Sequence, residues 1–216
     1  MLVQHYCYYL TDWAGISPRQ QDFDTNKVVK CLKGQPINGY AQIGIAGLSI
    51  RLEQSSKEEF LARLWTFIGK DVAKTLRETT TIVPIPNSSA VVGASPNYRT
   101  LSFASSMASA SSGKLVAEDC LRWRSAAPAV HTTAGHRSPE PRYDNLVVVQ
   151  KPTRPVILFD DVVTSGSSFI AAVWRLSEIG AALNKGLVVA RSTCNQEPNM
   201  FKAEGRDLAI PQPPLF

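Results

Sequence analysis

The stretch that decides the fold runs Val156-Ile157-Leu158-Phe159-Asp160-Asp161-Val162-Val163-Thr164-Ser165-Gly166-Ser167-Ser168. Its leading apolar residues are typical of a short buried strand in the middle of a parallel sheet. Two adjacent carboxylates, Asp160 and Asp161, stand at the carboxyl end of that strand. A turn rich in hydroxyls follows, and an apolar run with helical period begins at Phe169. The stretch therefore predicts a strand, a polar loop and a helix, in that order.

This order of elements suits a sugar phosphate. Backbone amides in the loop, together with the positive end of the following helix, form a site for a phosphate group. Asp160 and Asp161, placed just before the loop, can accept hydrogen bonds from a diol or hold a divalent cation. The plainer alternative is a buried strand with an Asp turn and a Ser-capped helix that binds nothing.

The stretch resembles the phosphoribosyl pyrophosphate (PRPP) binding motif of the type I phosphoribosyltransferases, which has hydrophobics, two acids, two hydrophobics and a Thr/Ser/Gly loop. The resemblance implies a parallel α/β sheet flanked by helices, with an N-terminal hood. It also implies an enzyme that transfers phosphoribose from PRPP to a nitrogenous acceptor and releases pyrophosphate. Asp160 and Asp161 would hold the ribose hydroxyls, directly or beside Mg²⁺. The ribose 5-phosphate would lie on Thr164, Ser165, Gly166, Ser167 and Ser168.

Composition places few limits on this interpretation. The chain has 216 residues, of which 44% are hydrophobic and 19% charged, as in ordinary globular proteins. The net charge of +5 suits anionic ligands, and a nucleic-acid partner stays open. No apolar run approaches the ~20 residues of a membrane span, and no secretory signal is recognisable. The scattered cysteines argue against a zinc site or a disulfide frame and favour a reducing, cytoplasmic location. They are Cys7, Cys31, Cys120 and Cys194.

The expected division is an N-terminal extension or hood over residues 1–54, a core domain over 55–194 and a tail over 195–216. Within the first part we expect a strand at 6–10, a polar loop at 17–25 and a short amphipathic piece at 27–33 ended by Gly34. We read Gly39, Gly44 and Gly47 as turns. In the tail, four prolines predict an irregular or partly disordered wrap.

In the core, helical spacing begins at Ser55, and Thr79–Pro86 is expected to form a strand. The loop after that strand, Asn87, Ser88 and Ser89, resembles the pyrophosphate loop of the family, although many members carry Lys or Arg there. A helix over 98–112 and strands over 145–149 and 187–190 complete the alternation of strands and helices.

The segment 116–141 is basic and irregular, and we expect residues 117–141 to be mobile. The family has a flexible loop here that closes over PRPP. By resemblance, basic residues of this segment and the one after it would meet pyrophosphate. They are Arg122, Arg124, His131, His136, Arg137 and Arg142, with Trp123 among them.

The sub-type is less determined. Thr164 stands where enzymes for 6-oxopurines usually carry Asp, which disfavours hypoxanthine–guanine activity. The order of elements over roughly residues 27–192, including Arg142-Tyr143-Asp144-Asn145, resembles the competence-associated (ComF-like) phosphoribosyltransferases. The chain lacks that group's zinc-knuckle cysteines, and Thr-Leu-Ser follows Arg99 in place of Gly-Phe-Asn. A PRPP- or nucleotide-binding regulatory protein without turnover is the alternative function, and a homodimer stays open.

Overall fold

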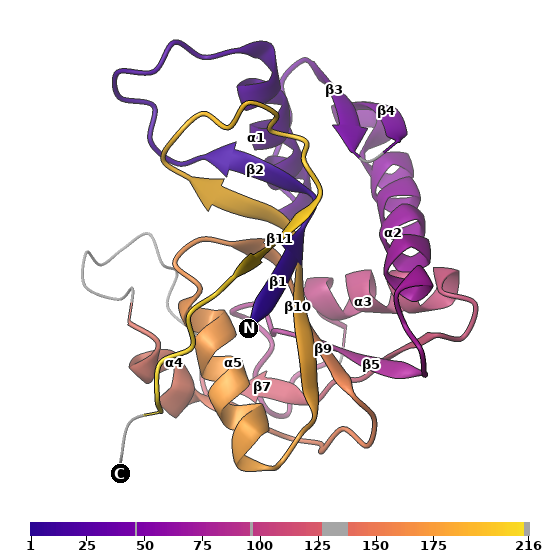
Figure 1. Ribbon diagram of the computed structural model, residues 1–216, viewed down its shortest axis with the longest axis vertical. Helices are drawn as coiled ribbons and strands as arrows, with labels where there is room; N and C mark the ends of the chain where they lie inside the picture. Colours follow the sequence, from indigo (N-terminus) through magenta and orange to yellow (C-terminus); the bar gives the residue numbers. More distant parts are fainter. Residues whose placement is uncertain (46, 96, 127–137, 214–216) are drawn as a thin grey trace.

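The computed structural model describes residues 1–45, 47–95, 97–126 and 138–213. In the described residues, a sheet of seven strands runs through the molecule in the order β11-β1-β10-β9-β5-β6, and β2 also pairs with β10 (Figure 1). Its pairings are parallel except for the antiparallel edge strand β11. The strands are β1 (Leu2–His5), β2 (Cys7–Leu10), β5 (Thr80–Pro84), β6 (Leu115–Ala117), β9 (Val156–Val163), β10 (Leu183–Thr193) and β11 (Glu204–Asp207).

Helices cover both faces of this sheet, which confirms the predicted α/β class. One face packs against α1 (Gln20–Leu32), α2 (Lys57–Lys74), α3 (Arg99–Ala110) and the hairpin β3 (Tyr40–Ile45) and β4 (Leu48–Glu53). The other face packs against α4 (Glu140–Asn145), α5 (Ser167–Glu178) and the two-stranded sheet β7 (Leu121–Trp123) and β8 (Leu146–Val148). Strand β9 therefore has a hydrophobic cluster on each side, as its apolar run predicts.

Two expectations for the N-terminal part are wrong. The segment 17–25 is not a loop, because α1 begins at Gln20. The Asp22 carboxylate accepts hydrogen bonds from the Arg19 backbone amide at 2.7 Å and from its guanidinium at 2.9 Å, which fixes this helix start. Gly44 lies inside β3, whereas Gly39 and Gly47 adopt left-handed turns with φ of +67° and +90°.

Strands β1 and β2 are part of the central sheet, since both pair in parallel with β10. The tail is also more ordered than expected. Strand β11 pairs with β1, and Phe201 lies in the main core. Hydrogen bonds between side chain and backbone join residues 196–200 to the segment that leads into α1, including one from Arg19 to the Glu197 carbonyl at 2.8 Å.

The basic segment 116–141 differs most from expectation. Residues 115–117 and 121–123 form β6 and β7, and Leu121–Trp123 is buried. Strand β8 joins β7 and not the central sheet. Residues 127–137, which include His131, His136 and Arg137, lie outside the described part of the chain. The start of this segment thus forms strands, because its apolar residues Leu121 and Trp123 pair with β8.

His5, the last residue of β1, is a buried titratable group. Its ring packs edge-on against Tyr8 at 4.5 Å, and its Nε2 lies 3.9 Å from the Glu204 carboxylate. Burial lowers the pKa of His5 to about 4. Glu204 opposes this shift, while Arg191 and Arg206 add to it.

We expect His5 to make the fold sensitive to acid. Its folded-state pKa lies below the ordinary 6.5, so the unfolded chain binds the extra proton, and stability is lost as pH falls from about 6.5 toward 4. Over this window the free energy of unfolding should fall by up to about 3 kcal/mol more in the parent than in His5→Phe. Urea denaturation at each pH measures the difference. Parallel curves for the two proteins would contradict the expectation.

Candidate functional site

The motif occupies the junction of β9 and α5, and its backbone explains the glycine. Strand β9 continues through both acids to Val163, beyond the apolar run that predicted it, and α5 begins at Ser167 and not at Phe169. Gly166 is the N-cap of α5 with φ of +80°. A Cβ there would lie 2.9 Å from Leu208 Cδ1, so both the backbone conformation and the space favour glycine.

The loop offers unpaired amides at the start of a helix. The backbone N–H groups of Thr164, Ser165 and Gly166 donate to no atom of the described residues. Thr164 and Ser165 are exposed, Ser168 is partly exposed, and the hydroxyls of Ser165 and Ser167 are 2.9 Å apart. These amides and the positive end of α5 together suit an anion such as a phosphate.

The two acids point to opposite faces of the sheet, as neighbours in a strand do. Asp161 shares its face with Phe159, which packs edge-on against Trp65 of α2. Asp160 lies on the other side, where Arg142 of α4 is close enough for the two charges to interact. The acid pair is therefore split between two environments.

Asp161 is 1% exposed, and both of its oxygens are occupied. Lys33 Nζ donates to one oxygen at 2.6 Å, and Arg99 Nη2 donates to the other at 3.0 Å. Arg99 also donates to the Lys33 carbonyl at 3.5 Å. Lys33 is the C-cap of α1 and Arg99 begins α3, so one carboxylate ties β9 to two helices.

Asp160 is partly exposed, and its Oδ1 accepts a hydrogen bond from the Asp161 amide at 2.8 Å. Limited access to water raises the pKa of Asp160 above its ordinary range. The charge of Asp161 adds to the shift, and Lys33 opposes it. Burial lowers the pKa of Arg142, while Asp160 opposes that shift. Asp160 is therefore a carboxylate that a further positive partner would stabilise in its charged form.

The sequence-predicted pyrophosphate loop lies at the same edge of the sheet. Pro84 pairs with Phe159, and Asn87 follows shortly after, so the loop lies beside the end of β9. The Asn87 amide donates to Ser89 Oγ at 3.0 Å, and Ser88 is exposed. Asn87, Ser88 and Ser89 carry no charge, so cations for an anionic ligand must come from elsewhere.

Sequence reasoning missed Lys33 and Arg99 as neighbours of Asp161. They lie 128 and 62 residues from it along the chain, so no local spacing connects them. Sequence reasoning also misplaced Arg122, which is 5% exposed and lies in β7 and not in a surface loop. Its guanidinium pairs with Asp119, donates to the Ser95 carbonyl at 3.2 Å and lies over the Tyr98 ring at 4.8 Å. Arg122 thus fixes the segment that leads into Arg99.

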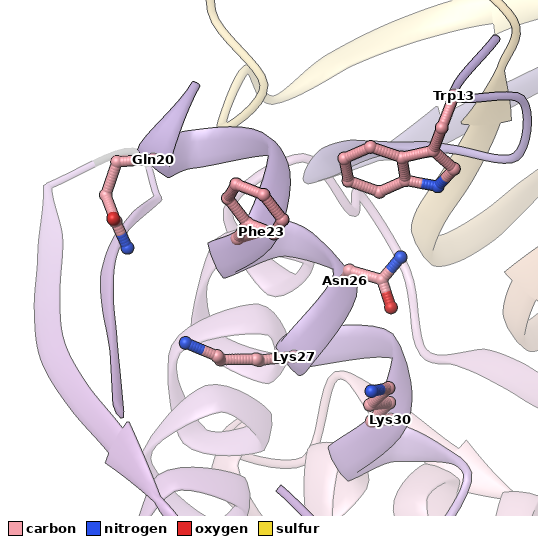
Figure 2. Close-up of a pocket in the computed structure, with 6 residues that line it drawn as sticks. All are labelled: Trp13, Gln20, Phe23, Asn26, Lys27 and Lys30. Atoms are coloured by element: carbon pink, nitrogen blue, oxygen red, sulfur yellow. The ribbon is translucent and has the colours of Figure 1, made fainter. Parts of the chain in front are cut away.

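A separate pocket of about 310 Å³ opens beside α1 (Figure 2). Its lining shares no residue with the β9–α5 loop and includes an aromatic pair, Trp13 and Phe23, stacked at 5.5 Å. The remaining lining residues are Gln20, Asn26, Lys27 and Lys30. Among the described residues, no group of three or more His, Cys, Asp or Glu is arranged to hold a metal ion, and no helix has the length and apolar character needed to cross a membrane.

Solved structures that resemble this chain include several phosphoribosyltransferases. A crystal structure of adenine phosphoribosyltransferase gives a TM-score of 0.40 at 14% identity, over 78% of this chain and 89% of that one. A hypoxanthine phosphoribosyltransferase from Staphylococcus aureus gives 0.39 at 11% identity, over 67% and 72%. Orotate phosphoribosyltransferase from Aeropyrum pernix gives 0.37 at 18% identity, over 76% and 79%. No protein-family model and no curated protein sequence matches the chain.

Proposed function

We propose that this protein is a phosphoribosyltransferase that transfers phosphoribose from PRPP to a nitrogenous acceptor and releases pyrophosphate. The observation that carries the proposal is the end of β9, where a partly exposed carboxylate stands beside the start of α5. There the backbone amides of Thr164, Ser165 and Gly166 donate to no described residue. The carboxylate can accept a hydrogen bond from a sugar hydroxyl, and the adjacent anion site can bind a phosphate on the same sugar.

In this proposal each part of the site has one task. The amides and hydroxyls of Thr164–Ser168 bind the 5-phosphate, and Asp160 accepts hydrogen bonds from the ribose hydroxyls. The bond from ribose C1 to pyrophosphate oxygen breaks through a loose, cation-like transition state, and its electron pair leaves with pyrophosphate. An acceptor nitrogen then bonds to C1 and gives up its proton. Such a reaction depends mainly on positioning and on charge stabilisation.

Of the two acids at the end of β9, only Asp160 is suited to bind Mg²⁺. Burial and the charge of Asp161 raise the pKa of Asp160, so a cation there would stabilise its charged form, whereas both oxygens of Asp161 are occupied by cations. Mg²⁺ usually binds one or two carboxylates together with waters and substrate phosphates, so a single protein ligand suffices. When bound, Mg²⁺ would neutralise charge on the pyrophosphate leaving group.

A protein that binds PRPP without turnover is the second candidate, because the loop Asn87–Ser89 carries no charge for pyrophosphate. The ComF-like resemblance does not name an acceptor for either candidate.

We expect calorimetry to show binding of ribose 5-phosphate and of PRPP, with PRPP bound more tightly when Mg²⁺ is present. Pyrophosphate release from PRPP across a panel of nitrogenous bases then separates enzyme from binding protein. Release with one base supports the transferase, and binding without release supports the second candidate. Absence of binding of both ligands, with and without Mg²⁺, would refute the assignment of the site.

A further inference from the structure

We propose that Asp161 is a positioning residue, which holds Lys33 and Arg99 in place so that these two cations receive the diphosphate of the ligand. The proposal rests on the proposed function and divides the acid pair into two roles. Asp160 would meet the ribose, and Asp161 would act on the ligand only through Lys33 and Arg99.

The geometry of Asp161 leaves it little capacity for a sugar. Its carboxylate is 1% exposed, and each oxygen already accepts a charged hydrogen bond, at 2.6 Å from Lys33 and 3.0 Å from Arg99. A ribose hydroxyl could bond to Asp161 only by displacing one of these cations. Breaking a buried charge pair is costly because it leaves an uncompensated charge.

Lys33 and Arg99 keep capacity for an anion. Their side chains are 37% and 33% exposed, and each has further N–H donors beyond the bonds it makes. The Nε of Arg99 is buried and donates to no described atom. Two cations share one carboxylate, so the group keeps a net positive charge. The two cations lie at the edge of the sheet where the loop Asn87–Ser89 supplies no positive charge.

The two helices explain why a positioning residue is needed. Lys33 follows the last turn of α1 and Arg99 opens α3, so neither helix by itself fixes one cation relative to the other. Asp161 and the bond from Arg99 to the Lys33 carbonyl join them. Pre-placed donors lose less conformational freedom when they bind an anion than free side chains do.

Charge alone predicts that Asp161→Asn would change PRPP affinity in the opposite direction to the positioning role. This difference makes the proposal testable. If Asp161 only reduced the positive charge of the site, Asp161→Asn would bind PRPP more tightly. If Asp161 positions the two cations, the same variant binds PRPP about tenfold or more weakly, the effect of losing one charged hydrogen bond. Ribose 5-phosphate has no diphosphate, so its affinity should stay within about threefold.

The experiment is a mutant cycle read by calorimetry with both ligands in the presence of Mg²⁺. We expect Lys33→Met/Arg99→Met to weaken PRPP by about a hundredfold and to leave ribose 5-phosphate nearly unchanged. Adding Asp161→Asn to that double variant should have no further effect, because its partners are gone. Lys30→Met, an exposed lysine of α1 without an ion pair to a described residue, is the matched control and should bind both ligands like the parent.

Folding of each variant is checked by circular dichroism, because the double variant leaves Asp161 buried without a cation. Should it unfold, Lys33→Met alone keeps Arg99 as a partner of Asp161. Adding Asp161→Asn to Lys33→Met should then weaken PRPP binding less than the same change does in the parent. Equal or tighter PRPP binding by Asp161→Asn, independent effects in the cycle, or an equal loss for ribose 5-phosphate would each overturn the positioning role. If the parent binds neither ligand, the proposed function itself fails.

Discussion

Asp160→Asn is expected to weaken both ribose 5-phosphate and PRPP by one to two orders of magnitude. A hydrogen bond to a charged acceptor contributes about 1.5–3 kcal/mol, which corresponds to about 10–150-fold in affinity. Asn is nearly isosteric with Asp, so the packing of Phe159 on Trp65 should not change. A loss that includes ribose 5-phosphate distinguishes Asp160 from Asp161, for which we expect a loss with PRPP only.

The pH dependence provides a second measure of the same residue. Because the pKa of Asp160 is raised, the carboxylate takes up its proton at a higher pH than an ordinary aspartate, and ligand affinity should fall as pH falls through that pKa. The Asn variant should lack that part of the pH dependence.

Asp144→Asn, at an exposed acid of α4, is the matched control and should bind like the parent. If Asp160 were only a turn former, Asn would serve nearly as well, since both residues make the same side-chain to backbone bonds. A folded Asp160→Asn protein with parental affinity would therefore remove Asp160 from the site.

Arg122→Met is expected to lower the free energy of unfolding by about 2–3 kcal/mol. The substitution leaves Asp119 without its bidentate partner, the Ser95 carbonyl without its donor and the Tyr98 ring without its cation. Loss of one member of a buried pair costs about 3–5 kcal/mol, and we reduce this value because Asp119 is 24% exposed. For a chain of this size each kcal/mol lowers Tm by about 2–4 °C.

Arg124→Met is the natural comparison, because both arginines belong to the same basic segment and Arg124 is exposed. Surface substitutions of this kind usually change stability by less than about 0.5 kcal/mol. Thermal and urea unfolding of the two variants measure the contrast. Similar losses of stability in the two variants, or no loss in either, would show that Arg122 does not stabilise the fold as its contacts indicate.

The parts of the fold that could be predicted are those encoded locally. The strand, acid pair, loop and helix of residues 156–178 follow one another without interruption, so period and residue type suffice. The apolar spacing of α2 and the β-branched run of β5 are equally local. Boundaries shifted where a tertiary contact or a cap extends an element, as with β9 through its acids and α1 from Gln20.

The parts that could not be predicted depend on contacts between distant segments. From composition, Arg122 is predicted to lie in a basic loop. Its burial depends on the ion pair with Asp119 and on the pairing of β7 with β8. The acid pair looked like one unit in sequence, yet alternation along the strand separates the two side chains. Only the packing of α1 and α3 against β9 brings Lys33 and Arg99 to Asp161.

The place of β1 and β2 in the sheet sets the order in which the chain can be assembled. Both strands leave the ribosome well before their partners, β10 and β11, which follow them after most of the described chain. Closing such distant pairs requires forming very long loops first, which slows folding. Until β10 emerges, the buried positions of β1 and β2, among them Val3 and Leu10, have no strand to pair with. Until β10 is made, a nascent chain thus exposes unpaired strand edges with apolar residues, a state prone to aggregation.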